Sequence, residues 1–217
     1  MRTLLLAAVL AGAPPTAGFH ASVRPLSAAN RAAIVAAGEW HSGCPVGLSG
    51  LRLLTVTYHG FDGKTHSGRI VVNRTAVAPV RSVFRRLFAL GFPIRHMRFS
   101  DTYGPKRVQP ADGDVTASFE CRQASSSPCG GTADTGNGHW SEHAYGEAVD
   151  LNPIENPYVG CGVTRESASR VYLDRSRVRR GMVTPAIVRA FRSVGWGWGG
   201  DWAGSTKDYM HFSASGH

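Results

Sequence analysis

The chain has 217 residues, of which 42% are hydrophobic, and this is enough to bury the core of one ordinary domain. The composition therefore excludes a wholly disordered protein. The chain contains 24 Lys and Arg, 21 of them Arg, against 15 Asp and Glu, which gives a formal net charge of +9. This balance favours anionic partners such as nucleic acid, acidic lipid surfaces or acidic cell-wall polymers, but no basic run longer than two residues supports a nucleic-acid-binding arm.

Residues 1–18 are typical of a secretory signal peptide. Arg2 precedes an apolar stretch from Leu4 to Gly12, and two prolines and the small residues 16–18 follow it. The apolar stretch is about half as long as the roughly 20 residues that a membrane-spanning helix needs, and the sequence has no second candidate downstream. We therefore expect a secreted protein without a membrane span, whose mature chain starts near Phe19.

Residues 19–47 are rich in Ala, Ser and Gly, and we expect them to form an N-terminal arm that packs on the following domain. They contain one predicted helix at residues 28–37, with Ser27 at the position of its N-cap. A single domain is expected from residue 48 to residue 217, because no internal repeat divides this stretch.

The four cysteines make an even number in a chain that we expect to be exported, which fits two disulfides. No CxxC pair occurs, so neither a thiol redox motif nor a Cys-rich zinc site is indicated. Three connectivities are possible, and among them we favour Cys44–Cys121 together with Cys129–Cys161.

Periodicity predicts the main elements of the domain. Alternating residues at 51–58, a turn at 60–63 and a second run at 69–72 predict a hairpin. Apolar residues at helical spacing predict a helix over 77–90 that covers one face of the sheet, with Gly91 as its stop.

The C-terminal half adds shorter elements. We expect a buried strand at 148–151, a helix that begins at Thr184-Pro185 and runs to Gly195, and a last strand around residues 209–212. This mixed order of strands and helices favours an α+β fold, with a small antiparallel β-sheet flanked by helices, over a parallel α/β sheet.

The segment at residues 141–150 carries the side chains with the clearest chemical role. His143 precedes a Gly turn, and Asp150 lies on the short strand that follows, so an imidazole and a carboxylate can reach one point. Zinc accepts this mixture, and a catalytic zinc takes three protein ligands and leaves a position for water. Alternation places Tyr209 and His211 on one face of the last strand, so His211 can supply the third ligand. Taken alone, this spacing is common, and a lone His more often has a surface or core role.

The order of several motifs is more specific. The pattern Ser-x-His-x-x-Gly-x-Ala-x-Asp at residues 141–150, followed by Leu-Asn-Pro and later by Asp-x-x-His-Phe at 208–212, resembles the zinc D-Ala-D-Ala carboxypeptidase and L-Ala-D-Glu endopeptidase family, peptidase family M15 of the VanY-like type, which cuts peptidoglycan stem peptides. Residues 118–122, 155–159 and 195–200 are similar to further blocks of one branch of that family. The resemblance extends from about Cys44 to Phe212.

The resemblance implies a role for each matching position. His143, Asp150 and His211 would be the zinc ligands, and Asp208 falls where the family places its catalytic Glu or Asp. Many members have Glu there, and Asp is shorter by one methylene. Arg122 matches a substrate- or transition-state-binding Arg. The fold implied is related to the metal-binding fold of hedgehog signalling domains.

Three residues are candidates for contact with the substrate. Ser141 matches a family residue that contacts substrate near the metal, and Arg122 would hold a substrate carboxylate. Tyr145 could donate a hydrogen bond to substrate, although aromatic packing is the alternative role. Glu147 is expected to point away from the metal, because side chains alternate along the strand that ends in Asp150.

The function implied by the resemblance is that of a secreted zinc metallopeptidase acting on peptidoglycan stem peptides, either as a D-Ala-D-Ala carboxypeptidase or as an L-Ala-D-Glu type endopeptidase. Zn²⁺ would activate a water molecule, Asp208 would act as general base, and Arg122 would stabilise the oxyanion or bind a carboxylate. We expect a monomer associated with the cell wall.

Two other classes of protein are alternatives. A non-catalytic zinc-containing module of the same fold could bind the cell wall or a protein, and a fourth protein ligand on the metal would favour it. A nucleic-acid-binding protein would fit the charge, but no recognition motif supports it. Neither GxSxG nor SxxK occurs, which disfavours a serine peptidase.

Overall fold

The structure, a computed structural model, describes residues 18–99, 104, 106, 110–130 and 138–217. The predicted signal peptide at residues 1–18 therefore lies outside the described residues except for Gly18, and it stays a prediction. Within the described ranges, no helix combines the length and the apolar character needed to cross a bilayer.

The largest sheet is built around the predicted hairpin, which is confirmed. β2 (Leu51–Gly60) and β3 (Thr65–Asn73) pair antiparallel, and β1 (Ala21–Pro25) pairs antiparallel with β2. The short β4 (Pro93–Ile94) runs parallel to β2 and pairs with its end. Residues 21–25 of the N-terminal arm are thus a strand of the main sheet.

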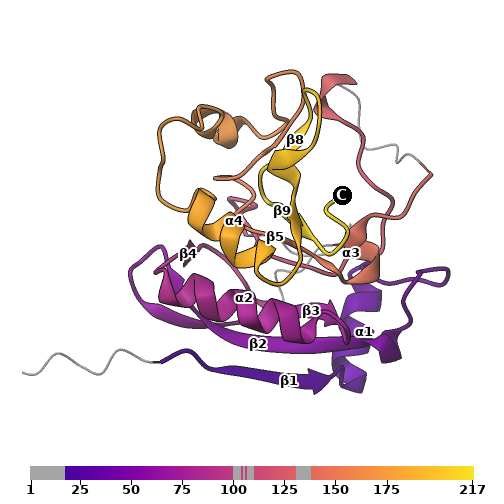
Figure 1. Ribbon diagram of the computed structural model, residues 1–217. Coiled ribbons are helices and arrows are strands. Elements are labelled where there is room, and N and C mark those ends of the chain that lie inside the picture. The colour runs from indigo at the N-terminus through magenta and orange to yellow at the C-terminus, as the bar shows by residue number, and fades with distance from the viewer. Residues whose placement is uncertain (1–17, 100–103, 105, 107–109, 131–137) are drawn as a thin grey trace, which may run out of the picture.

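One face of this sheet packs against the predicted helix α2 (Val77–Ala89) (Figure 1). Apolar residues of β2 and β3 form a single buried cluster with α2, with α4 (Pro185–Arg192) and with Phe212. Both helices were predicted, although α4 ends at Arg192 rather than at Gly195. This cluster joins the large sheet to the C-terminal part of the chain.

The other face of the sheet is covered by α1 (Ala28–Ala36), which begins at the predicted N-cap Ser27. Leu53 and Val71 of the sheet share a buried cluster with Ile34 of α1 and with Cys121. The N-terminal segment is therefore packed directly beneath the segment that leads to Arg122.

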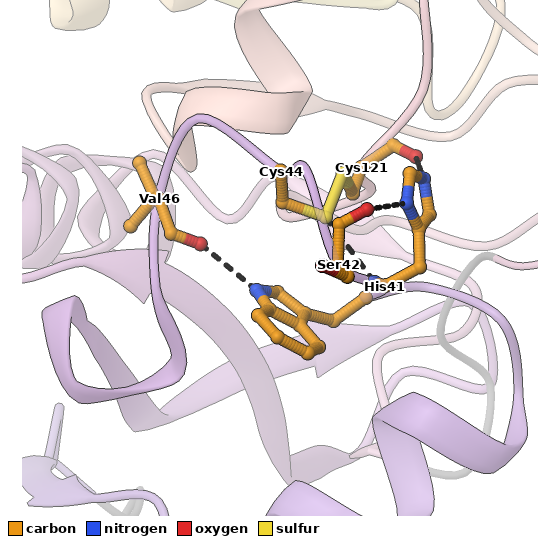
Figure 2. Close-up of a disulfide and its surroundings, with 6 residues drawn as sticks. His41, Ser42, Cys44, Val46 and Cys121 are labelled. Atoms are coloured by element: carbon orange, nitrogen blue, oxygen red, sulfur yellow. Dashed lines mark hydrogen bonds between the residues drawn. A yellow bond between two sulfur atoms is a disulfide. The ribbon is translucent and has the colours of Figure 1, made fainter.

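Both favoured disulfides are present. Cys44 is bonded to Cys121, and Cys129 is bonded to Cys161. Figure 2 shows the first bridge beside His41, whose main-chain N–H donates to Cys44 Sγ and whose ring contacts the main-chain oxygen of Cys121. The bridge links the loop after α1 to the residue just before Arg122.

The remaining strands are short. β5 (Ala148–Asp150), β9 (His211–Ser213) and β7 (Gly197–Trp198) form an antiparallel sheet in the order β5-β9-β7, and β6 (Tyr158–Val159) pairs with β8 (Lys207–Asp208). In Figure 1 β5, β8 and β9 lie above the large sheet. Short 3₁₀ helices lie at Leu48–Gly50, Pro128–Gly130, Ser167–Tyr172 and Gly199–Asp201.

The prediction of a single last strand around residues 209–212 is wrong. Residues 209–212 do not form one strand, because β8 ends at Asp208 and β9 begins at His211, with a bend between them. The two strands belong to different sheets, so the chain has to change direction at Tyr209 and Met210. The protein as a whole has small antiparallel sheets and a few helices, in agreement with the expected α+β class.

Candidate metal centre and active site

Three buried side chains from different elements meet at one point. His143 lies on the short helix α3 (Glu142–Tyr145), Asp150 ends β5, and His211 begins β9 directly opposite Asp150. His143 Nε2 is 3.2 Å from both His211 Nδ1 and Asp150 Oδ1, and His211 Nδ1 is also 3.2 Å from Asp150 Oδ1. The three predicted ligands are therefore brought together.

The spacing of these atoms suits one metal ion. Two ligand atoms bound to tetrahedral zinc at about 2.1 Å lie about 3.4 Å apart, close to the separations in this site. The second group of potential ligands among the described residues, His41 with Cys44 and Cys121, lacks thiolates because its cysteines form a disulfide. The site at His143 is thus the one with suitable donors in the described part of the chain.

Hydrogen bonds fix the protons of both imidazole rings. His143 Nδ1–H donates to the carbonyl oxygen of Ser118 at 2.5 Å, and His211 Nε2–H donates to a main-chain oxygen of His217 at 3.1 Å. Both oxygens can only accept, so in each neutral ring the lone pair lies on the nitrogen that faces Asp150. Three electron-pair donors then face one another, an arrangement that a shared cation stabilises.

The electrostatics of the cluster keep Asp150 ionised. Burial alone would raise the pKa of this carboxyl, but the charges and hydrogen bonds that His143 and His211 supply when their rings are protonated hold it well below its usual range. Burial would likewise lower the pKa of His211, yet its hydrogen bond to Asp150 and the nearby negative charge raise it. The pocket therefore favours a negative carboxylate beside a positive centre.

The pattern at residues 141–150 explains how the ligands are presented. Ser141 caps α3, because its Oγ accepts a hydrogen bond from the main-chain N–H of His143. α3 ends at Gly146, which has a φ of 68° and whose absent side chain would lie 2.7 Å from the main-chain nitrogen of Asn73. Only glycine fits this turn, which sends the chain into β5.

Asp208 lies at the end of β8 and lines the same cleft as the three candidate ligands. Its Oδ1 is buried and has no hydrogen-bond partner among the described residues. Burial, and then the negative charge of Asp150, raise the pKa of Asp208 to about 7, while His211 and Arg122 act in the opposite direction. The protein therefore holds a carboxyl group that can gain or lose a proton near neutral pH.

Arg122 is held in a defined position near Asp208. Its Nε donates to Glu120 Oε2 at 2.7 Å, and its Nη1 donates to the carbonyl oxygen of Gln123 and to Ser125 Oγ, both at 3.1 Å. Its positive charge acts to lower the pKa of Asp208, against the stronger effects of burial and of Asp150.

All these groups line one cleft of about 940 Å³. Its walls include Ser141, His139 and Trp202. The ring of Trp202 lies 5.6 Å from that of His211. The cleft is thus lined by the candidate ligands together with aromatic and polar residues.

Some residues considered from the sequence lie elsewhere. Tyr145 is 37% exposed and is not among the residues that line the cleft. Glu147 points away from the metal ligands, as expected, and accepts a hydrogen bond from Thr75 Oγ1 at 2.6 Å.

Sequence reasoning missed the groups that orient the two imidazoles. They are main-chain oxygens of Ser118 and His217, and a main-chain oxygen gives no side-chain signal in a sequence. The position of Ser118 follows from an isolated antiparallel bridge between Ala117 and Asp150, which places residue 118 beside β5.

Comparison with known proteins agrees with this site. A family model described as D-alanyl-D-alanine carboxypeptidase matches residues 135–214, a range that contains the three candidate ligands and Asp208 but not Arg122. No curated protein and no solved structure matches the chain. Over residues 135–214 the chain is therefore similar to this family, in agreement with the resemblance to peptidase family M15 that the motifs at 141–150 and 208–212 indicated.

Proposed function

We propose that the protein is a zinc-dependent peptidase that hydrolyses peptide bonds in peptidoglycan stem peptides outside the cytoplasm. The observation that carries the proposal is the convergence of His143, Asp150 and His211 in a cleft that also holds Asp208 and Arg122. The family match supports the same reaction class. The two disulfides are typical of oxidising compartments and support an extracytoplasmic location.

His143 Nε2, Asp150 Oδ1 and His211 Nδ1 would hold the zinc ion. When bound, zinc polarises a carbonyl group and lowers the pKa of a water molecule. Among the described residues, no fourth His, Cys or carboxylate joins the group of three, which is the ligand count of a catalytic rather than a structural site. This count favours a hydrolase over a non-catalytic zinc module.

Asp208 would act as the general base and then as the general acid. Because its pKa is raised to about 7, it can take a proton from the attacking water and return it to the departing amine. The unpartnered Oδ1 is the atom that would carry this proton. The side chain is one methylene shorter than the Glu that many members of the family have at this position.

Arg122 and Ser141 would orient the substrate. Arg122 brings a positive charge to the cleft, where it can bind a peptide carboxylate or stabilise the oxyanion of the tetrahedral intermediate. Ser141 lines the cleft next to the ligand His143, so its hydroxyl can contact the substrate near the scissile bond.

The proposal is tested with a defined stem pentapeptide and the purified protein. We expect about one zinc per chain by elemental analysis, cleavage that a chelator abolishes, and recovery of cleavage when zinc is added back. Mass spectrometry of the products identifies the bond: loss of one terminal D-Ala indicates a carboxypeptidase, and an internal cut indicates an endopeptidase.

Asp208→Asn separates the roles within the site. The variant should keep its zinc and lose about 10²- to 10⁴-fold in kcat, the usual range for loss of a general acid–base group. Full activity of a zinc-loaded Asp208→Asn protein would disprove the role of Asp208. Zinc and peptide binding without turnover by the wild type would instead identify the non-catalytic module.

A further inference from the structure

Positive charge is unevenly distributed between the two parts of the protein. Residues 18–99, which form the large sheet with α1 and α2, contain eleven Lys and Arg but only two acidic residues, Glu39 and Asp62. Residues 100–217, which contain the candidate site, have twelve basic and thirteen acidic residues. The part with the large sheet therefore has a net charge of +9, and the part with the candidate site has a net charge of −1, which the charge of Arg2 offsets.

The helix α2 concentrates this charge on one surface. Arg81, Arg85 and Arg86 are exposed, while the residues of α2 that pack on the sheet are Val80, Val83, Phe84 and Leu87. Arg81 and Arg85 are one helical turn apart, so their side chains are neighbours on the outer face. We call these three arginines the α2 basic face.

The charges of the α2 basic face are not neutralised by the protein. No ion pair joins Arg81, Arg85 or Arg86 to a carboxylate of the described residues, and the sequence has no Asp or Glu between Asp62 and Asp101. The guanidinium of Arg85 lies 5.9 Å from the centre of the Phe19 ring, a contact that leaves its charge in place. Three close positive charges of this kind raise the local concentration of anions.

We propose that the α2 basic face binds a linear phosphodiester polymer of the poly(glycerol phosphate) type, which would hold the protein on a polyanionic wall while the separate cleft acts on peptides. A chain of phosphates matches neighbouring arginines such as Arg81 and Arg85, because each guanidinium can form paired hydrogen bonds to one phosphate. The proposal concerns a surface outside the cleft and does not depend on the proposed peptidase activity.

Two other polyanions fit this face less well. A helix that lies in a membrane interface presents a free apolar face to the lipid, whereas the apolar face of α2 is buried in the core. Single-stranded nucleic acid is usually held by exposed aromatic rings, and the one exposed large apolar side chain next to α2 among the described residues is Leu90. A flexible polymer without bases or acyl chains needs neither feature.

The test compares two triple variants of the full chain. Arg81→Gln, Arg85→Gln and Arg86→Gln together remove the α2 basic face. The control carries Arg170→Gln, Arg177→Gln and Arg179→Gln, which removes the same charge from exposed positions in the other part of the protein. Circular dichroism melting verifies the fold of both variants, and cleavage of a soluble peptide should be unchanged in both.

Binding to poly(glycerol phosphate) is measured by titration calorimetry at several salt concentrations. We expect the α2 variant to bind at least tenfold more weakly than wild type at low salt. The slope of log K against log[salt] should also be smaller in magnitude by about 2, because each of the three lost phosphate contacts contributes roughly 0.7 to that slope. The control variant should stay within threefold of wild type.

Several results would overturn the proposal. Equal losses in the two triple variants would mean that only the overall charge matters. Equal or tighter binding of wild type to phosphatidylglycerol vesicles or to DNA would assign the face to a membrane or to nucleic acid. Absence of polymer binding by a folded wild-type protein would refute it outright, whatever the result of the peptidase assay.

Discussion

Asp150 and His211 are opposite one another on the neighbouring antiparallel strands β5 and β9, with Asp150 Oδ1 3.2 Å from His211 Nδ1. Two residues that are 61 positions apart in the chain are thereby fixed by the backbone ladder of a three-stranded sheet. The candidate metal site is consequently built in part on the paired strands β5 and β9, and its geometry should survive substitutions that leave these strands intact.

The first prediction concerns Asp150→Asn. The amide preserves the shape of the side chain but removes the negative charge that attracts the cation and interacts with His143 and His211. We expect zinc affinity to fall by more than the roughly 10- to 100-fold that the loss of an outer hydrogen-bond partner costs. Competition with a chromophoric chelator measures this affinity.

Glu147→Gln is the matched control for that experiment. Glu147 lies just before the same strand, but its carboxylate binds Thr75 and not the metal ligands. The control should keep wild-type zinc affinity. Wild-type affinity in the Asp150→Asn protein would show that the carboxylate is not a ligand.

The second prediction concerns Gly199, which lies against Asp208. A methyl group at Gly199 would lie 2.5 Å from the main-chain oxygen of Asp208 and 2.9 Å from its Cβ. Gly199→Ala should therefore displace Asp208 while leaving the ligands on α3, β5 and β9 in place. We expect unchanged zinc content and a roughly 10- to 100-fold lower kcat, since misplacement of a catalytic group by about 1 Å has effects of this size.

Gly47→Ala is the control, because the nearest atom to an added methyl there is Ser49 Oγ at 4.0 Å. The Gly47 variant should retain both zinc and kcat. If Gly199→Ala retained full activity with normal zinc, the close contact to Asp208 would have no part in catalysis.

The parts of the site that could be predicted from the sequence are the local ones. Between Ser141 and Asp150 a capped turn of helix, a glycine turn and a three-residue strand follow one another. The spacing of His143 and Asp150 in the sequence therefore determines how their side chains lie relative to each other. The hairpin β2–β3 and the helix α2 could be predicted for the same reason, because each has a clear periodicity.

The parts that could not be predicted depend on contacts between distant segments. Strands of two residues, such as β8, have no detectable period, so the break between Asp208 and His211 is invisible in the sequence. The approach of Gly199 to Asp208 is likewise a tertiary contact. The grouping of Arg95, Asp114 and Glu155 likewise joins three segments that carry no common motif.

The third prediction concerns pH and the buried carboxyl of Asp114. Its Oδ2 accepts from Arg95 Nε at 2.9 Å and its Oδ1 from the main-chain N–H of Ile154 at 3.1 Å. Burial, followed by the hydrogen bond and charge of Glu155, raises the pKa of Asp114 from 3.8 to about 8. The folded state therefore binds this proton more tightly than the unfolded state does.

The sign of the effect follows from proton linkage. Between about pH 4 and pH 8 the folded protein holds the Asp114 proton and the unfolded chain does not, so this group's contribution to the free energy of unfolding falls as pH rises. Asp114→Asn imitates the protonated side chain and cannot titrate. Relative to wild type, the variant should gain stability steadily from pH 4.5 to pH 8.5 in urea unfolding experiments.

Asp174→Asn is the control for the pH series. Asp174 is exposed, and its hydrogen bonds to Ser176 lower its pKa, so its stabilising effect is lost only in more acidic solution. The difference between this control and wild type should be constant over the same range. A constant difference for Asp114→Asn as well would show that its proton is not held on folding.

The fourth prediction separates the two disulfides. Cys44–Cys121 closes a span of 77 residues and Cys129–Cys161 one of 32, and loop entropy assigns about 4 kcal/mol of stability to each. Removal of either pair by Ser should lower the free energy of unfolding by a similar amount, in the range of about 2–5 kcal/mol. Stability measurements alone will therefore not distinguish their roles.

Kinetic measurements should distinguish the two disulfides, because Cys121 of the Cys44–Cys121 bridge directly precedes Arg122 in the chain. The main-chain N–H of Cys121 also donates to the carbonyl oxygen of Glu39, so loss of the bridge loosens the segment that carries the guanidinium. Cys44→Ser with Cys121→Ser should lower kcat/KM for a small stem peptide about tenfold or more, with normal zinc content. Cys129→Ser with Cys161→Ser, compared at a temperature where both proteins are folded, should change it less. The opposite order of effects would mean that the loop beyond Ser125, and not the anchor of Arg122, governs substrate binding.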